Sequence, residues 1–437
     1  MSDWDTDGLV AADKRYLWHP FTSMHDWCAP GHEPLVLVEG HGALLRDSRG
    51  QEYIDGNSSI WTNIHGHNHP RINAAIRRQL DLVAHTSFLG FTNPPAIELA
   101  RSIVELFPPN TLSRVFYSDD GSTGVEVALR IADQYWRLRG SERPQFIAFK
   151  DAYHGDTAGA ASLGAAAMFQ DGVANWNFPA RAVRSVAELE ALTAKEASEI
   201  AAVVIEPMVQ GAAGIRLWAP GTLSAVRNWC DRSSALLIAD EVLTGFGRTG
   251  KMFACQHESV TPDMMVLAKG LSGGYLPLAI TLITEMIFSA FSNFPGKENT
   301  LYYGHSYTGN ALACAAAKAS LEIFDEERVL DDLAAKIETL RIELLSLREM
   351  PCVAEVRQCG FIVGVEVRED PAKTDARHGD LGAAICLAAR RRGLLTRPIR
   401  NVIVLMPPYC IPPSQLRQAV RALGEAIAEV CEETVPA

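Results

Sequence analysis

The chain has 437 residues, and its 48% hydrophobic and 21% charged content is ordinary for a globular enzyme. This length exceeds what one hydrophobic core usually covers, so we expect two domains. The net charge of −12, from 40 Lys and Arg against 52 Asp and Glu, disfavours nucleic acid and anionic membranes as partners.

Nine cysteines are scattered along the chain, with no C-x-x-C pair and no metal-ligand spacing. Isolated cysteines in odd number are most simply explained by reduced thiols, which favours a cytoplasmic protein. The first residues are acidic and do not resemble an export signal. No apolar run approaches the roughly 20 residues needed to cross a bilayer, so we expect no membrane association.

The N-terminal segment, residues 1–60, is predicted to be irregular. Two short strands are expected at 35–38 and 43–45, before a turn at 47–50. A helix is expected to begin near Pro70, because proline favours the first helical position.

Three alternating histidines raise the question of a metal site. His65, His67 and His69 would share one face only if the segment formed an extended strand. Gly66 and Pro70 interrupt such a strand, so we predict that no metal is bound here.

Strands and helices are expected to alternate between about residues 61 and 330. Strands are predicted at 114–118, 145–149, 201–205, 235–239 and 264–268, and helices at 121–140 and 220–233. This order predicts a mainly parallel sheet with helices on both faces.

A long helix is expected at 329–347, before a region of mixed elements. There, strands are predicted at 361–367 and 402–406, and helices at 380–392 and 414–431. We therefore predict an α/β fold with a large domain at 61–330. Residues 1–60 and 331–437 are expected to build a smaller α+β domain together.

Two neighbouring strands end on opposite charges. The strand at 235–239 stops at Asp240 and the strand at 264–268 stops at Lys269, 29 residues later, a separation that suits one crossover connection. Ligands in open α/β sheets bind at such carboxyl ends. A lysine beside an acid is what pyridoxal phosphate (PLP) requires, since the lysine bonds to the cofactor and the acid keeps its ring nitrogen protonated. A structural ion pair would leave the same pattern.

Other strand ends carry candidate cofactor ligands. Gly121 and Ser122 begin a predicted helix, whose free N–H groups could hold a phosphate. A plain helix cap would favour the same residue types. Tyr153 follows the strand at 145–149 and could stack on a flat cofactor or simply pack in a loop. The turn at 304–310 could be a second phosphate contact.

Arg397 is a candidate carboxylate ligand, because a guanidinium offers a planar pair of donors. The alternative is a solvated surface arginine, since three further arginines stand nearby at positions 391, 392 and 400.

Taken together, these segments resemble the class III (ornithine-type) PLP-dependent aminotransferases of fold type I. The matching motifs are Ile205-Glu206-Pro207, Asp240–Gly250, Leu267–Gly270 and Gly309-Asn310. The resemblance implies a fold type I PLP-dependent transferase that moves amino groups, with PLP as cofactor and a homodimer that shares its active sites.

A narrower resemblance covers nearly the whole chain. The matching segments are Trp18–Ser23, Ile64–His67, Asp133–Trp136, Tyr153–Thr157, Val209–Gly211 and Met406–Tyr409. They are similar to the diaminopelargonate synthases, the branch of the class that aminates 8-amino-7-oxononanoate to 7,8-diaminononanoate in biotin biosynthesis.

The resemblance implies specific roles at the cofactor. Lys269 would carry PLP and act as general acid and base, Asp240 would pair with the ring nitrogen, and Tyr153 would stack on the ring. The phosphate ligands would be Gly121 and Ser122, together with His305 and Ser306 of the second subunit. The family has a Pro-Thr pair at these last two positions, and Ser306 keeps the hydroxyl.

The resemblance also implies substrate contacts. Gly304 and Arg397 would bind substrate, Arg397 through its carboxylate, and Arg248 falls near the substrate pocket. Phe21, Ile60 and Trp61 match the positions expected to face the amino donor.

The donor side departs from members of the branch that use S-adenosylmethionine. Those members commonly have Tyr where Phe21 stands, two tryptophans where Ile60 and Trp61 stand, and often Tyr at Val404. Each change removes a hydroxyl or an aromatic face. S-adenosylmethionine stays the donor by family default, and lysine is the alternative donor.

Three other functions are weighed against this one. Another class III ω-aminotransferase acting on diamines or β-alanine would share most of the motifs. A non-catalytic PLP-binding regulator would have little reason to keep Lys269. A nicotinamide-dependent dehydrogenase would need a G-x-G-x-x-G turn after the first strand, which is missing.

Overall fold

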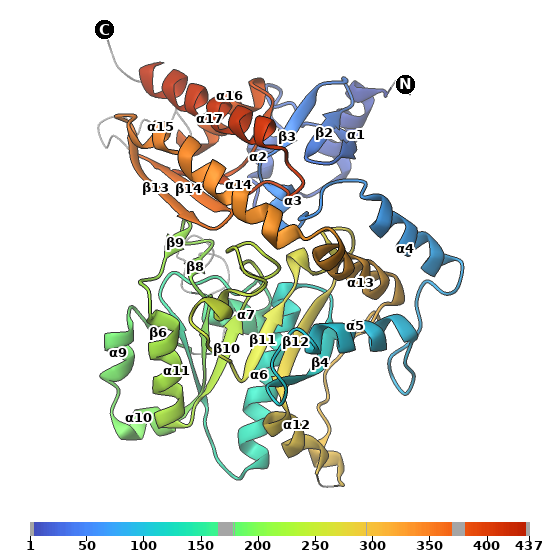
Figure 1. Cartoon of the computed structure of the whole chain (residues 1–437), viewed down its shortest axis with the longest axis vertical. Helices are drawn as coiled ribbons and strands as arrows, with labels where there is room; N and C mark the ends of the chain where they lie inside the picture. Colours follow the sequence, from blue (N-terminus) through green and yellow to red (C-terminus); the bar gives the residue numbers. More distant parts are fainter. Residues whose placement is uncertain (1–3, 165–177, 179, 294, 369–380, 434–437) are drawn as a thin grey trace.

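The computed structural model describes residues 4–164, 178, 180–293, 295–368 and 381–433 (Figure 1). Its centre is a seven-stranded sheet in the order β4-β12-β11-β10-β7-β5-β6. The strands are β4 (Leu112–Ser118), β5 (Gln145–Phe149), β6 (Arg181–Val183), β7 (Ile200–Ile205), β10 (Leu236–Asp240), β11 (Met264–Leu267) and β12 (Ala279–Thr284). All pairs are parallel except those of β12, which runs antiparallel to both β11 and β4.

The central strands are apolar throughout because both faces of the sheet are covered. Every residue of β7 and β10 is buried. Along β10, Leu237 and Ala239 belong to one core cluster, whereas Leu236 and Ile238 belong to another. This alternation is what a strand with two covered faces requires.

Helices pack against this sheet on both sides (Figure 1). The helices of this part of the chain are α4 (Pro70–Leu80), α5 (Pro94–Val104), α6 (Gly121–Leu138), α7 (Ala158–Leu163), α9 (Val186–Glu190), α10 (Ala194–Ser198), α11 (Thr222–Ser233), α12 (Glu285–Ser292) and α13 (Ala311–Glu326). Short 3-10 turns lie at Ala254–His257, Lys269–Ser272 and Lys297–Asn299, and a two-stranded ribbon pairs β8 (Val209–Gln210) with β9 (Arg216–Leu217).

The two ends of the chain meet in the upper part of Figure 1. One small sheet joins β1 (Leu37–His41), β2 (Leu44–Asp47) and β3 (Glu52–Asp55) to β15 (Leu394–Leu395) from the C-terminal region. A second sheet has the order β13-β14-β17-β16, from Val353–Cys359, Ile362–Val367, Val402–Leu405 and Pro398–Ile399. The helices of the C-terminal region are α14 (Val329–Glu343), α15 (Leu345–Arg348), α16 (Leu381–Arg391) and α17 (Pro413–Glu433). The β3–β15 pairing supports a small domain built from both termini, although the boundaries at 60 and 330 stay predictions.

The N-terminal segment is more regular than we predicted. Residues Thr6–Tyr16 form α1, Met24–Trp27 form α2, and β3 was not expected from the sequence. Helix α1 buries none of its residues, so it lacks the core-facing apolar stripe that reveals a helix in a sequence. Strand β1 begins at Leu37 rather than at residue 35.

Candidate active site

A cavity of about 480 Å³ lies at the carboxyl ends of the central strands. We call it the strand-end cavity. Its wall comes from the segments that follow β4, β5, β7, β10 and β11, and from the loop after β3. Six of the predicted site residues line it, namely Trp61, Gly121, Ser122, Tyr153, Asp240 and Lys269. The parallel pairing of β10 with β11 explains how residues far apart in sequence reach one cavity.

Asp240 is held firmly at the end of β10. Its side chain is almost fully buried, and its Oδ2 lies 2.7 Å from Nδ1 of His154. Oδ1 accepts the backbone N–H of Val242 at 3.1 Å. Because both oxygens have partners, the carboxylate has a fixed orientation toward the cavity.

His154 was missed by the sequence reasoning, although it follows Tyr153 directly. Burial lowers the pKa of His154, but the hydrogen bond to Asp240 and the charge of that carboxylate more than offset this and raise the pKa overall. Its Nε2 is buried without a hydrogen-bond partner among the described residues. The histidine therefore holds the Asp240 carboxylate in place through a buried hydrogen bond.

Lys269 lies two residues after the end of β11 and lines the same cavity. Its φ of 30° lies in the left-handed region, which is unusual for a residue other than glycine. Burial lowers the pKa of the Lys269 ammonium. A larger neutral fraction makes the amine a better nucleophile and proton acceptor. The Nζ atom lies 4.8 Å from the centre of the Trp61 ring.

Glu206 is a second carboxylate of the cavity wall that the sequence reasoning did not assign. It lies directly after β7, and burial raises its pKa to about 7. Its oxygens accept the N–H of Tyr153 at 3.2 Å and the N–H of Gly211 at 2.9 Å. Glu206 thus fixes two loops of the wall, and its place at a strand end was the available signal.

The start of α6 forms a candidate phosphate cradle. Asp120 caps the helix through a capping box with Thr123, which leaves the first-turn N–H groups of Gly121 and Ser122 without intrahelical partners. The Ser122 hydroxyl accepts the N–H of Asp156 at 3.0 Å. A Cβ on Gly121 would stand 2.8 Å from Val242, so the cradle requires a glycine there.

Tyr153 lines the cavity beside this cradle. Its hydroxyl donates to Asp156 Oδ2 at 2.6 Å, and burial raises its pKa, so the phenol stays neutral. An aromatic side chain held in this way offers a flat surface to a planar ligand.

Several other predicted site residues do not line the cavity in this chain alone. Phe21 is 64% exposed and Ile60 is 46% exposed. Arg397 is exposed on the connection between β15 and β16. Outside the cavity wall, too, lie Gly304, His305 and Ser306. Their roles stay predictions.

Arg248 is almost completely buried and does not line the cavity. Its guanidinium donates to the carbonyls of Pro407 at 3.0 Å and Trp61 at 3.3 Å, and it lies 5.0 Å from the centre of the Tyr409 ring. Burial lowers its pKa. These contacts fix the guanidinium in the interior, and the predicted substrate contact of Arg248 stays a prediction.

The three alternating histidines have protein partners. His65 pairs with Ser320 at 3.0 Å, His67 with Asp55 at 2.9 Å, and His69 with Glu327 at 3.4 Å. Among the described residues no group of three or more potential ligands could hold a metal. Within the same part of the chain, no helix is long and apolar enough to cross a membrane.

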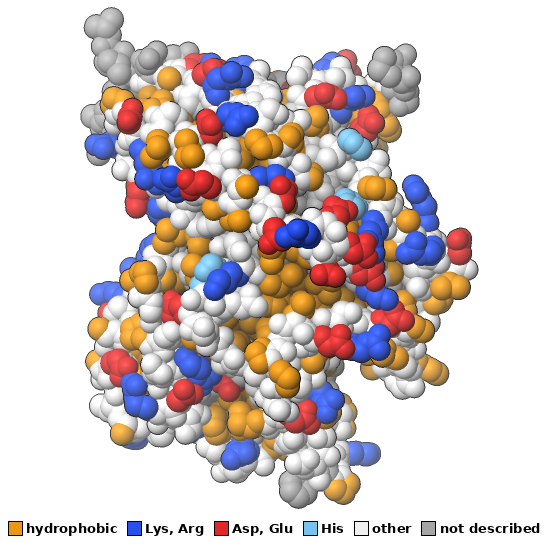
Figure 2. Space-filling view, viewed as in Figure 1, with side chains coloured by type: hydrophobic (Ala, Val, Ile, Leu, Met, Phe, Trp, Pro, Cys, Tyr) orange, Lys and Arg blue, Asp and Glu red, His pale blue; other side chains and the backbone are white. Residues whose placement is uncertain are grey.

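Figure 2 shows hydrophobic side chains in a second hollow near the middle of the molecule, where α5, α13 and α14 meet in Figure 1. It has a volume of about 540 Å³, and Leu106, Met252, Leu321, Phe324 and Leu330 contribute its apolar wall. Its charged rim combines Lys318 and Arg328 with three acids, at positions 322, 325 and 331. No side chain in it combines burial and polarity as Asp240 and Lys269 do.

The family model of the class-III aminotransferases matches residues 27–427. The chain belongs to this family. The protein is therefore a PLP-dependent aminotransferase with pyridoxal phosphate as its cofactor.

Named relatives align with almost the whole length of this class-III aminotransferase. The adenosylmethionine-8-amino-7-oxononanoate aminotransferase of Geobacter sulfurreducens is 43% identical and covers 98% of this chain and 99% of its own. The crystal structure of the Methanocaldococcus jannaschii protein of that name is 39% identical, with a TM-score of 0.93 over 97% of this chain and 99% of that chain. An (S)-enantioselective omega-transaminase from Thermomicrobium roseum is 32% identical, with a TM-score of 0.90 over 98% of this chain and 100% of that chain.

The residues present fit pyridoxal phosphate. Lys269 supplies a buried amine with a lowered pKa, Asp240 an oriented carboxylate, and α6 a helix N-terminus with a glycine-dependent approach. An aldehyde, a pyridine nitrogen and a phosphate each meet a suitable group in one cavity.

Proposed function

We propose that this aminotransferase converts 8-amino-7-oxononanoate to 7,8-diaminononanoate in biotin biosynthesis. The observation that carries the proposal is full-length similarity at about 40% identity to relatives named for this reaction. The default donor is S-adenosylmethionine, and lysine is the alternative donor.

The chemistry begins with the cavity side chains. When bound, pyridoxal phosphate supplies an electron-withdrawing ring that stabilises negative charge beside the transferred nitrogen. Asp240 would keep the ring nitrogen protonated, and His154 would hold the Asp240 carboxylate in place. The Nζ atom of Lys269 would accept a proton from the donor carbon. It would give a proton back when the amino group is transferred to the ketone carbon of the acceptor.

Residues outside the cavity wall would recognise the substrate. Arg397 would bind the carboxylate of 8-amino-7-oxononanoate, which requires substrate to extend from the cavity toward the β15–β16 connection. Gly304 would contact substrate as well. The exposure of Arg397 is compatible with a group that becomes covered only when substrate is bound.

The three residues that depart from the S-adenosylmethionine users do not line the strand-end cavity. Val404 is fully buried in a small apolar cluster against which Trp61 packs, so it does not face the cavity directly. Phe21 and Ile60 do not line the cavity of this chain. The proposal that lysine is the amino donor therefore requires these substitutions to act at the mouth of the cavity or across a subunit boundary.

We also propose a cytoplasmic homodimer. Supporting it, large apolar side chains stay exposed in the single chain, among them Trp18, Phe21, Leu82, Leu89, Phe91 and Tyr307. Phosphate contacts by His305 and Ser306 would then come from the second subunit. The nine scattered cysteines, with no C-x-x-C pair among them, suit a reducing compartment. The net charge of −12 suits small-molecule substrates rather than nucleic acid.

The proposal is tested by product formation. Purified protein with pyridoxal phosphate is incubated with 8-amino-7-oxononanoate and either S-adenosylmethionine or lysine, and 7,8-diaminononanoate is quantified by mass spectrometry. We expect product with at least one donor, and none with the Lys269→Ala variant. Turnover of β-alanine or diamines without any 7,8-diaminononanoate would instead establish the ω-aminotransferase alternative. Stable binding of PLP without turnover of any of these substrates would favour the non-catalytic regulator.

A further inference from the structure

The loop between β3 and α4 contains an unusual turn, Ser58–Trp61 (α3). Its four residues have φ values of 46°, 48°, 67° and 68°, so the backbone is left-handed throughout. None of them is glycine, and Ile60 is β-branched, so every position carries a steric cost. A run of this kind persists only where the surroundings hold it in place.

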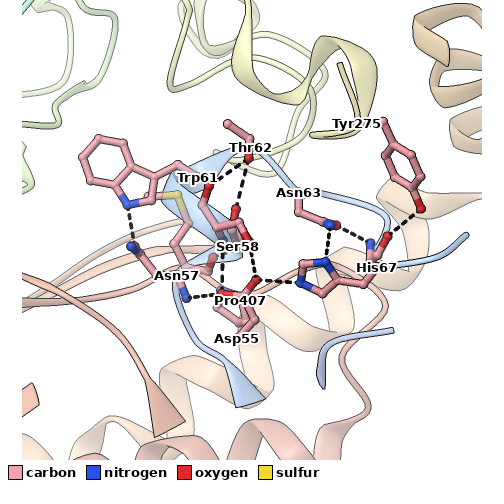
Figure 3. Close-up of polar contacts among 12 residues, drawn as sticks. Asp55, Asn57, Ser58, Trp61, Thr62, Asn63, His67, Tyr275 and Pro407 are labelled. Atoms are coloured by element: carbon pink, nitrogen blue, oxygen red, sulfur yellow. Dashed lines mark hydrogen bonds and ion pairs between the residues drawn. The ribbon is translucent and has the colours of Figure 1, made fainter. Parts of the chain in front are cut away.

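Asp55 supplies contacts that hold the first half of the turn (Figure 3). The carboxylate is 2% exposed and accepts the N–H of Asn57 at 3.3 Å. It also accepts the N–H of Ser59 at 3.1 Å and the Ser59 hydroxyl at 3.0 Å. On its other side it lies 2.9 Å from Nε2 of His67. Asp55 therefore anchors the turn to the segment that leads into α4.

Further partners hold the first and last residues of the turn. The Trp61 indole N–H donates to Asn57 Oδ1 at 2.7 Å, which Figure 3 shows beside the turn. The Trp61 carbonyl accepts from Arg248, and the Ser58 hydroxyl donates to the Met406 carbonyl at 2.7 Å. The turn is thus fixed at both ends before any ligand is bound.

The turn determines where the Trp61 ring lies. Trp61 lines the strand-end cavity, and its ring centre is 4.8 Å from Lys269 Nζ. An extended or right-handed backbone at Ser59 and Ile60 would send the indole in another direction. We propose that Asp55 is a positioning residue, which holds the left-handed turn and thereby places the Trp61 ring over Lys269.

This inference rests on the proposed function for its kinetic consequence, but not for its structural one. A misplaced indole should weaken the substrate-side wall and expose the lysine. The competing interpretation is that Asp55 only links β3 to His67. The two interpretations differ in what a glycine at position 59 should do, because glycine adopts positive φ without the Cβ clash.

The first test uses cofactor-free protein and measures how fast acetic anhydride labels Lys269, by peptide mass spectrometry. Asp55→Ala should raise the labelling rate about tenfold, toward the rate of Trp61→Ala, through loss of the ring that covers Nζ. The matched control is Asp47→Ala. Asp47 is also buried in the same small sheet and accepts the Tyr53 hydroxyl and two turn N–H groups, but these partners lie outside the Ser58–Trp61 turn.

The second test is rescue. Asp55→Ala combined with Ser59→Gly should recover most of the Lys269 protection, and should bring a raised KM for 8-amino-7-oxononanoate back toward the native value. Recovery supports the positioning role. An unchanged labelling rate in Asp55→Ala, an equal rise in Asp47→Ala, or no recovery with Ser59→Gly would each overturn it. If Asp55→Ala does not fold, Asp55→Asn takes its place, since it keeps one acceptor oxygen and the same shape.

Failure of the proposed function would look different. In that case native protein forms no 7,8-diaminononanoate with either donor, while the labelling rates of the variants still decide the role of Asp55.

Discussion

Among single residues, Asp240 has the most specific chemical requirement in the site, because only an ionised acid can keep a pyridine nitrogen protonated. Asp240→Asn keeps the size of the side chain and can still accept from His154. We expect the variant to fold normally and to lose turnover by at least about a hundredfold, or roughly 2.7 kcal/mol of barrier. Steady-state kinetics and thermal unfolding check this, and near-normal turnover would contradict it.

Glu206 gives a prediction about pH. Burial raises the pKa of Glu206 in the folded protein from 4.5 to about 7. The contribution of this group to the free energy of unfolding is therefore fully present below pH 4.5. That stability is lost as the pH rises through about 7, because the unfolded state releases the proton earlier. Between pH 4.5 and 7, the free energy of unfolding of cofactor-free protein should fall by up to about 3 kcal/mol from this group. Urea unfolding across this range should give a flatter profile for Glu206→Gln, and identical profiles would refute the assignment.

At the scale of elements, the site depends on close contact between the loop after β5 and the start of α6. Gly155 has a φ of 129°, and a Cβ there would lie 2.6 Å from the backbone Cα of Ser122. Gly155→Ala should therefore displace the cradle and weaken binding of pyridoxal phosphate about tenfold or more, measured by absorbance titration. Gly140→Ala is the control, since it has a positive φ at the other end of α6 but open space around it. Equal cofactor affinity in both variants would show that the contact is not needed.

The elements of the central sheet were predictable because their signals are local. Strands β5, β7, β10 and β11 are short apolar runs, and α6 and α11 carry periodic apolar faces, so their predicted bounds differ from the observed ones by about two residues at most. Strand β12 was not predicted, and its antiparallel direction could not have been, since an apolar run carries no information about its orientation.

Site residues could be predicted from the sequence only where they follow a recognisable strand. Asp240, Lys269, Gly121 and Tyr153 follow predicted strands, and residues at the ends of parallel strands converge at one edge of the sheet. The left-handed turn at Ser58–Trp61 left no such signal, because nothing in Ser-Ser-Ile-Trp favours positive φ. Its conformation comes from side-chain contacts with Asp55, four residues before Ser59, and with the distant Arg248, which the pattern of apolar residues does not reveal.

At the scale of the whole molecule, substrate binding should bring the C-terminal region into the site. Arg397→Lys keeps the charge but loses the paired donors, so the KM for 8-amino-7-oxononanoate should rise about tenfold with a smaller change in kcat. Arg400→Lys, nearby in the turn between β16 and β17, is the control and should behave like the native protein. A defect confined to the donor half-reaction would show that Arg397 does not bind the acceptor.

The central claim is that Lys269 carries the cofactor in a cavity shared with Asp240, and borohydride reduction tests it most directly. Holoenzyme is reduced, digested and analysed by peptide mass spectrometry. We predict a phosphopyridoxyl adduct on the peptide that contains Lys269, and no adduct at that site in Lys269→Ala. An adduct on a different lysine of the native protein, or a yellow Lys269→Ala protein that still yields a reducible covalent complex, would contradict the account.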